Sequence, residues 1–151
     1  MSDREATVGA VRTASRSLSR LLDADASAAS VLDRLDDPVR VDAEDVDELV
    51  HQKSHELLRI AARDLTGLDD LRTTARSLSD LGDAVLRQAT AIAGADDLAV
   101  VAMGKLGARE VNYASDLDVL FVGTEGAGYD HLEQQAQAVL QVAGRCFRID
   151  P

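Results

Sequence analysis

Apolar residues recur three and four positions apart through most of the chain before residue 94, which is the spacing of one face of an α-helix. Two early groups of them predict two short helices: Leu18, Leu21 and Leu22, then Val31, Leu32 and Leu35. The acidic stretch with Asp42 and Asp45 then predicts the start of a longer helix, because side-chain carboxylates accept hydrogen bonds from the unpaired amides of a first helical turn.

Two longer helices are expected after this acidic stretch. The first has an apolar stripe over residues 46–61 and should end at Gly67. The second covers about residues 70–93, and Gly94 supplies the left-handed residue that commonly closes a helix. Two consecutive helices joined by so short a connection are expected to pack antiparallel.

The pattern changes at Leu98 from helical spacing to continuous apolar runs. LAVVAM, from Leu98, and LDVLFVG, from Leu117, have the length and composition of strands buried on both faces. A glycine-punctuated connection with a short helical turn near Arg109 and Glu110 joins them. An amphipathic helix over residues 130–144 and the strand-like RCFRID follow. This order predicts an α+β fold, with a helical region over residues 1–94 and a core with a small mixed sheet over residues 95–151.

Composition limits the classes of function. The formal net charge of -11 argues against a nucleic-acid surface, because phosphate binding needs clustered Lys and Arg. The single cysteine, Cys146, has no partner for an internal disulfide and is expected to be a small packing residue. The first residues lack the pattern of a secretory signal, and no run approaches the ~20 apolar residues of a membrane span. A cytoplasmic protein that does not contact a membrane is therefore expected.

Two carboxylates, Asp116 and Asp118, flank Leu117 at the start of the second strand. Side chains alternate along a strand, so residues two apart point to the same face, with Cα atoms about 6.5 to 7 Å apart. Neighbouring carboxylates repel each other unless a cation compensates them, and Mg²⁺ prefers such oxygen ligands together with substrate phosphates. The sequence therefore predicts a Mg²⁺ site here, although an isolated acidic pair is more often a solvated strand end.

A glycine-lysine segment precedes the acidic pair. Backbone amides around Gly104 and Gly107 can approach phosphate oxygens where no side chain intervenes, and Lys105 adds a positive charge. Ser115 is a further candidate contact for phosphate or metal, with a turn hydroxyl as the equal alternative. Each signal is weak alone, but the order strand, glycine-lysine segment, Ser-Asp-x-Asp and buried strand favours a phosphate-handling site.

This order resembles the polymerase-beta-like nucleotidyltransferase superfamily, with Gly104 as its glycine and Asp116 and Asp118 as its first two metal carboxylates. Lys105 departs from it, since many members carry Gly or Ser there. Met-Gly-Lys-Leu-Gly at residues 103–107 and Glu-Val-Asn-Tyr-Ala-Ser-Asp-Leu-Asp at 110–118 are similar to the glutamine synthetase adenylyltransferase/adenylyl-removing family. LLRIAARDLTG, residues 57–67, resembles the helix before that module, so the resemblance covers the chain from Leu57 onward.

The resemblance implies an activity, its partners and a third site residue. The family has one half that adds AMP from ATP to a tyrosine of glutamine synthetase, and one that removes it with phosphate to give ADP. Asn112 and Tyr113 resemble the removing half, whereas LLRIAARDLTG is also similar to the adding half. Asp150 corresponds to a third metal carboxylate, although local sequence alone favours a surface acid. The family continues past this point with Leu-Arg-Pro-x-Gly, so an incomplete core is expected.

Other interpretations remain open at this stage. The chain is also compatible with a non-catalytic module that binds glutamine synthetase or a PII-type signalling protein, or with a nucleotidyltransferase for another acceptor. The three histidines, His51, His55 and His131, lack the spacing of a zinc motif and are expected on helix surfaces. Arg109 is expected to contact either a phosphate or a carboxylate.

Overall fold

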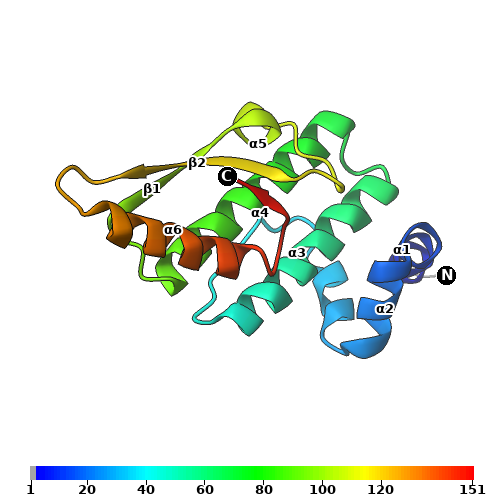
Figure 1. Ribbon diagram of the computed structural model, residues 1–151. Helices are drawn as coiled ribbons and strands as arrows, with labels where there is room; N and C mark the ends of the chain where they lie inside the picture. The colour runs from blue at the N-terminus through cyan, green and yellow to red at the C-terminus, as the bar shows by residue number, and fades with distance from the viewer. Residues whose placement is uncertain (1–2) are drawn as a thin grey trace.

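The structure, a computed structural model, describes residues 3–151 (Figure 1). Along the chain the elements are α1 (Asp3–Ala14), α2 (Arg16–Ala24), the 3-10 helix η1 (Ala28–Asp33), α3 (Val46–Leu65), α4 (Leu71–Ile92), β1 (Leu98–Ala102), α5 (Gly104–Ala108), β2 (Leu117–Gly123), α6 (Tyr129–Ala143) and β3 (Ile149–Asp150). The predicted α+β class, with N-terminal helices before a small mixed sheet, is confirmed.

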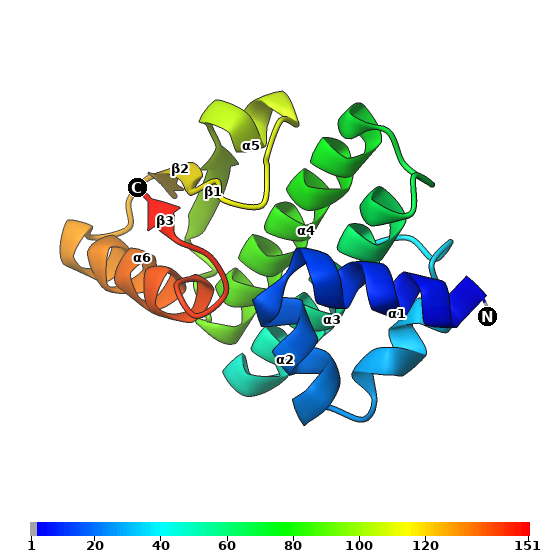
Figure 2. The same ribbon diagram turned by 90° about the vertical axis from the view of Figure 1, so that its right-hand side faces the viewer.

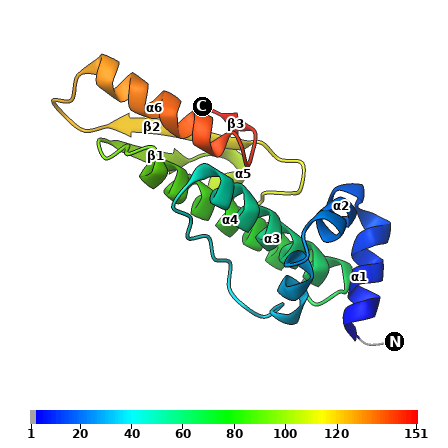
Figure 3. The same ribbon diagram turned by 90° about the horizontal axis from the view of Figure 1, so that it is seen from below.

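The two long helices begin and end close to where the sequence predicts. The Asp45 carboxylate accepts a hydrogen bond from the Glu48 amide at 2.9 Å, and the Asp70 carboxylate does the same for Thr73 at 2.8 Å. These caps satisfy amides that have no partner within their helices. Gly67 and Gly94 follow the helices with φ of 72° and 61°. Residues 66–70 connect α3 to α4, and the two helices pack side by side (Figure 3).

The beginning of the chain differs from the predicted pair of short helices. Helix α1 precedes the expected helix α2, and the apolar group at Val31 and Leu32 forms the 3-10 helix η1 instead of an α-helix. A further difference lies between β1 and β2, where Gly104–Ala108 forms the short helix α5. Its end, at Arg109, is close to the helical turn that the sequence predicts, so the turn begins earlier than expected.

The sheet has the order β1-β2-β3, with β1 antiparallel and β3 parallel to β2. Helices α4 and α6 pack beside each other against one of its faces (Figure 2). Leu117 and Val119 of β2 point into this packing, together with Val85 of α4 and Val139 of α6. The sheet therefore joins the larger hydrophobic core through alternate residues of its strands.

The prediction that both strands are buried on both faces is wrong. Val101, Leu120 and Val122 are 40%, 53% and 48% exposed, whereas Leu117 and Val119 are buried. Alternate side chains of a strand point to opposite faces of the sheet. Within residues 3–151, α4 and α6 cover only one of these two faces. The second face of the sheet is apolar and open, and the same alternation places Asp118 on it.

A smaller core holds the N-terminal helices together. Its buried residues come from α1, α2, η1 and α3: Val11, Leu18, Ala28, Leu32, Leu58, Ala61 and Ala62. Helix α3 thus contributes to both cores, because Leu49 and Ile60 belong to the larger one. The larger core extends across residue 94, where the helical region meets the sheet, and the division into two domains stays a prediction.

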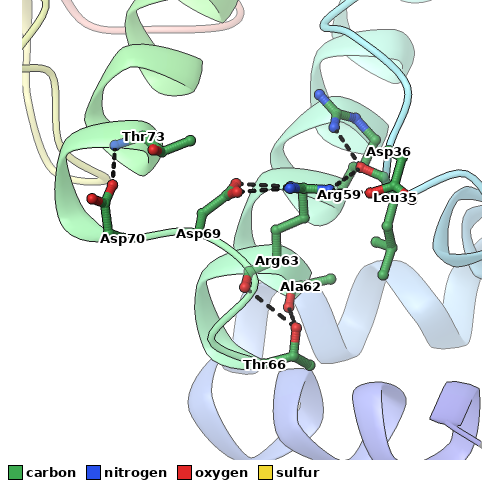
Figure 4. A network of polar contacts seen from close by, with 9 residues as sticks. All are labelled: Leu35, Asp36, Arg59, Ala62, Arg63, Thr66, Asp69, Asp70 and Thr73. Atoms are coloured by element: carbon green, nitrogen blue, oxygen red, sulfur yellow. Dashed lines mark hydrogen bonds and ion pairs between the residues drawn. The ribbon is translucent and has the colours of Figure 1, made fainter.

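Hydrogen bonds from two arginines of α3 attach the segment after η1 and the segment before α4 to this helix (Figure 4). Arg63 donates two hydrogen bonds to the Asp69 carboxylate, at 2.8 and 2.7 Å, and also donates to the Leu35 carbonyl and to Asp36. Arg59, which is 5% exposed, donates to the same Leu35 carbonyl at 3.0 Å. The hydrogen bonds to Asp69, and after them the bond to Asp36, raise the pKa of the Arg63 guanidinium above its usual value. Part of the LLRIAARDLTG segment therefore has a structural role.

None of the helices within residues 3–151 combines the length and apolarity required to cross a membrane.

Candidate functional site

Two of the three predicted metal carboxylates lie on one face of neighbouring strands, and the third lies just before one of these strands. Asp118 of β2 is the register partner of Asp150 of β3, and the two strands are parallel, so both side chains leave the sheet on the same side. Asp116 lies two residues before Asp118, next to Leu117, whose amide donates to the Arg148 carbonyl at 2.9 Å. The backbone therefore brings Asp116, Asp118 and Asp150 together at the end of the sheet where β2 begins.

The side chains of these residues are more widely spaced than their backbones suggest. Asp116 forms an ion pair with Arg148, with 3.5 Å between Oδ2 and Nε. Within residues 3–151, one group of three His, Cys, Asp or Glu residues has its ligand atoms all within 4.8 Å of one another, and this group does not include the three aspartates.

Gly104 contacts the second carboxylate directly. It begins α5 with a φ of 48°, and an added Cβ would overlap the Asp118 carboxylate. The preceding amide, of Met103, donates to the Asp118 carbonyl at 2.9 Å. The glycine is therefore required twice, by its positive φ and by the close approach of the α5 backbone to Asp118.

Gly107 and Lys105 occupy different environments on α5. A Cβ at Gly107 would lie 2.8 Å from the Ala102 carbonyl oxygen, so this glycine permits close packing of α5 on β1. Lys105 is exposed, and its carbonyl accepts a hydrogen bond from the Glu110 amide at 2.8 Å. The close packing accounts for Gly107 without a ligand, and the phosphate role of both residues stays a prediction.

Arg109 joins the end of α5 to α4. Its backbone is left-handed, with a φ of 62°, and its guanidinium forms ion pairs with Asp83 and, at 3.3 Å, with Asp80. Of the two alternatives left open by the sequence, phosphate or carboxylate, the structure has the carboxylates. Arg109 thus holds the glycine-lysine helix against the long helix α4.

Ser115 and Asn112 build the turn that leads into the acidic pair. The Asn112 amide donates to the Ser115 hydroxyl at 3.0 Å, and the Asn112 side chain accepts from the Ala114 amide at 2.9 Å. Tyr113, inside this turn, donates its hydroxyl to the Asp64 carboxylate of α3 at 2.9 Å. Burial raises the pKa of Tyr113, and the bond to Asp64 raises it further. Ser115 therefore has the turn role, and a ligand contact stays a prediction.

The description of the histidines as plain helix-surface residues is wrong for His55. Its side chain is 15% exposed and its Nε2 lies 2.6 Å from the Asp25 carboxylate, which His51 also contacts. His131 pairs with Asp97 at 2.9 Å. Asp25 lies 26 residues before His51 in the sequence, so no local spacing rule finds this partner.

Cys146 lies in the turn before β3, not on a strand as the sequence predicts, and it packs against the larger core. Burial raises the pKa of its thiol, which disfavours the thiolate and agrees with a packing residue.

A sequence model of the family described as glutamate-ammonia ligase adenylyltransferase matches residues 10–146, which is most of the chain. The chain belongs to this family. Two similar proteins are bifunctional glutamine synthetase adenylyltransferase/adenylyl-removing enzymes. The enzyme of Streptomyces avermitilis is 48% identical to this chain over 101 residues, and that of Streptomyces coelicolor is 47% identical to it over 103 residues. Each match covers 62% of this chain, and the corresponding enzyme of Cutibacterium acnes is 43% identical over 76 residues, or 44% of the chain.

The chain spans about a tenth of the length of these relatives, since the matches cover 10%, 10% and 8% of them. The resemblance inferred from the motif at residues 103–118 is thereby confirmed at the level of the adenylyltransferase family.

Proposed function

We propose that this chain supplies a Mg²⁺-dependent nucleotidyltransferase core that regulates glutamine synthetase, and that it removes AMP from a tyrosine of that enzyme. The observation that carries the proposal is the parallel register of Asp118 and Asp150, with Asp116 two residues before Asp118 and Gly104 against Asp118. Family membership supports the substrate, because the related enzymes act on glutamine synthetase by name.

The donor set fits Mg²⁺. Three carboxylates from adjacent strands provide hard oxygen ligands, and all three side chains are partly or fully exposed, so a phosphate-bearing substrate can share the cation. When bound, Mg²⁺ would supply positive charge to the phosphoryl oxygens during in-line displacement. We assign the ligand role to Asp116, Asp118 and Asp150.

The remaining site residues position the phosphate and the ligands. The Gly104 backbone brings the first amides of α5 to Asp118, and the exposed Lys105 side chain adds a positive charge for phosphate oxygens. The turn closed by Ser115 directly precedes Asp116 and the start of β2. In the removing direction an inorganic phosphate oxygen attacks the phosphorus of the AMP group, the bond to the tyrosine oxygen breaks, and the tyrosine leaves as ADP forms.

The direction of the reaction rests on Asn112 and Tyr113, which resemble the removing half of the family. In the adding direction, the tyrosine hydroxyl would attack the α-phosphate of ATP and release pyrophosphate. The two directions use the same carboxylates, so product analysis separates them.

The experiment uses adenylylated glutamine synthetase, inorganic phosphate and Mg²⁺, with the chain alone and within a polypeptide of its relatives' length. ADP release is expected, and Asp118→Asn should reduce it at least 100-fold, because the substitution removes a ligand charge and leaves the side-chain shape unchanged. Asp47→Asn, at a side chain 93% exposed in the first turn of α3, should have no effect. Pyrophosphate release from ATP with unmodified glutamine synthetase would instead assign the adding direction.

The rival proposals predict different results from the same samples. A binding module for glutamine synthetase or a PII-type protein would co-purify with its partner and release neither ADP nor pyrophosphate from either polypeptide. A nucleotidyltransferase for another acceptor would leave glutamine synthetase unchanged, and it would release pyrophosphate from ATP only after that acceptor is added to take the AMP group. Either result would contradict the proposed substrate.

A further inference from the structure

Two histidines of α3 and one aspartate after α2 meet at a point far from the acidic face of the sheet. His51 and His55 are one helical turn apart, and their ring centroids are 4.1 Å apart. Both Nε2 atoms approach the same oxygen of Asp25, at 2.9 Å from His51 and 2.6 Å from His55. The three ligand atoms all lie within 4.8 Å of one another.

The aspartate is fixed in the direction of the histidines. Its other oxygen, Oδ1, accepts hydrogen bonds from the Ser27 amide at 2.8 Å and the Ser27 hydroxyl at 2.6 Å. The bond from the Ser27 hydroxyl, followed by that from His55, holds the pKa of the Asp25 carboxyl well below its usual range. An ionised carboxylate therefore presents its free oxygen, Oδ2, to two imidazoles, with Ser27 in the orienting position common behind metal ligands.

From this cluster we propose a Zn²⁺ site formed by Asp25, His51 and His55. Two ring nitrogens and one carboxylate oxygen are a donor set that zinc accepts, and three protein ligands leave one coordination position for water. One divalent cation replaces the two ring protons that otherwise point at a single carboxylate oxygen. The site lies apart from the proposed Mg²⁺ carboxylates, and it uses a ligand class that Mg²⁺ disfavours.

The geometry requires little movement for the cation to enter. Bonds of about 2.0 to 2.1 Å in a tetrahedral site place neighbouring ligand atoms about 3.3 Å apart. The present separations from Asp25, 2.6 and 2.9 Å, must therefore open by about 0.7 and 0.4 Å to reach this value. The His51 side chain is 53% exposed, so ions and water reach the site from solvent.

The proposed site is a structural clip. It joins the residue that follows α2 to the first half of α3, beside the smaller core that holds the N-terminal helices. A bound cation would close a chain segment from residue 25 to residue 51, which restricts the unfolded chain more than the folded one. Zn²⁺ should therefore raise the unfolding temperature of this protein.

The first test is a Zn²⁺ titration of the full chain that carries Asp116→Asn and Asp118→Asn, in excess Mg²⁺, so that the sheet carboxylates do not compete. One Zn²⁺ per chain is expected. His55→Gln and Asp25→Asn should each weaken binding at least ~10-fold, the lower end of what the loss of even an outer contact costs. His131→Gln is the matched control, because it removes a histidine paired to one aspartate at 2.9 Å, and it should leave Zn²⁺ affinity unchanged.

A second measurement does not depend on the variants remaining folded. In the chain with native histidines, Zn²⁺ should shift the Nε2 resonances of His51 and His55 in nitrogen NMR spectra and leave those of His131 in place. Shifts at all three histidines, or at none, would overturn the proposal. Equal weakening of Zn²⁺ binding by His131→Gln and His55→Gln would also overturn it.

Discussion

Gly104 lies so close to Asp118 that a single added carbon at Gly104 would overlap the Asp118 carboxylate. The contact couples the first residue of α5 to the centre of the acidic face, and it links the glycine of the sequence motif to a carboxylate fourteen positions later. Because the φ of Gly104 is also positive, at 48°, the backbone here disfavours any side chain for two separate reasons.

Replacing Gly104 by alanine should therefore displace Asp118. We expect the proposed nucleotidyl transfer to fall at least 100-fold, with a loss of about 1–3 kcal/mol in the free energy of unfolding from overpacking and strain. Gly126→Ala is the matched control, because Gly126 has a φ of 87° but no atom within 4 Å of an added Cβ. It should cost stability through strain alone and leave transfer unchanged. Equal losses of transfer in the two variants would contradict a specific role for the contact.

The acidic face should bind divalent cations through more than one carboxylate. The double variant Asp116→Asn, Asp118→Asn is expected to lower Mn²⁺ affinity at least 10-fold, because it removes two of the proposed ligand charges and keeps the side-chain shapes. Electron paramagnetic resonance of free Mn²⁺ measures the affinity directly. Unchanged affinity in the double variant would show that the site assignment is wrong. Asp47→Asn removes one exposed carboxylate of α3 and should leave the Mn²⁺ affinity unchanged.

Arg63 should be more costly to replace than an arginine in an exposed ion pair. Arg63→Met removes the guanidinium that donates two hydrogen bonds to the Asp69 carboxylate, whose side chain is 4% exposed. A loss of about 2–4 kcal/mol is expected, because an unpaired buried charge retains its desolvation penalty. Arg145→Met breaks only an exposed pair with Asp47 at 3.8 Å and should cost less than about 1 kcal/mol. Urea unfolding of both variants tests the difference, and similar midpoints would contradict this account of the network.

Local patterns in the sequence predicted the elements that depend on local chemistry. Asp70 and Gly94 mark the ends of α4 because capping and left-handed closure involve neighbouring residues alone. The face of each strand that is covered depends instead on where distant helices pack, so the exposure of Leu120 did not follow from a continuous apolar run. Hydrophobic runs specify burial only where the covering elements are known.

The candidate site also combines features that the sequence predicts with contacts that depend on the fold. The alternation of a strand put Asp116 and Asp118 on one face, and the motif resemblance added Asp150, whose register with Asp118 needs the fold. The overlap of Gly104 with Asp118 and the meeting of His55 with Asp25 depend on contacts between separate elements, and no spacing rule encodes them. Family resemblance supplied roles for the three aspartates and also named Gly104, but it did not predict the contact of Gly104 with Asp118 and gave no role to His55 or Asp25.

The Tyr113 hydroxyl should make the stability of the folded state depend on pH in the alkaline range. Burial, and then the hydrogen bond to Asp64, raise the pKa of Tyr113 above its ordinary value of about 10. A group whose folded pKa is raised contributes stability below the unfolded pKa and loses it as pH rises, because the unfolded chain releases the proton first. Stability should therefore fall above about pH 10, and Tyr113→Phe should reduce this fall.

The chain has two tyrosines, so the ionisation itself can be followed by ultraviolet absorbance of tyrosinate. Tyr113→Phe should remove the part of the absorbance change that occurs at the highest pH, and Tyr129→Phe, at a residue 78% exposed, should leave that part in place. If Tyr113→Phe instead removes the earlier part, Tyr113 ionises freely in the folded chain and its bond to Asp64 does not persist in solution. The turn that carries Asn112 and Ser115 would then be less firmly attached to α3 than the 2.9 Å contact implies.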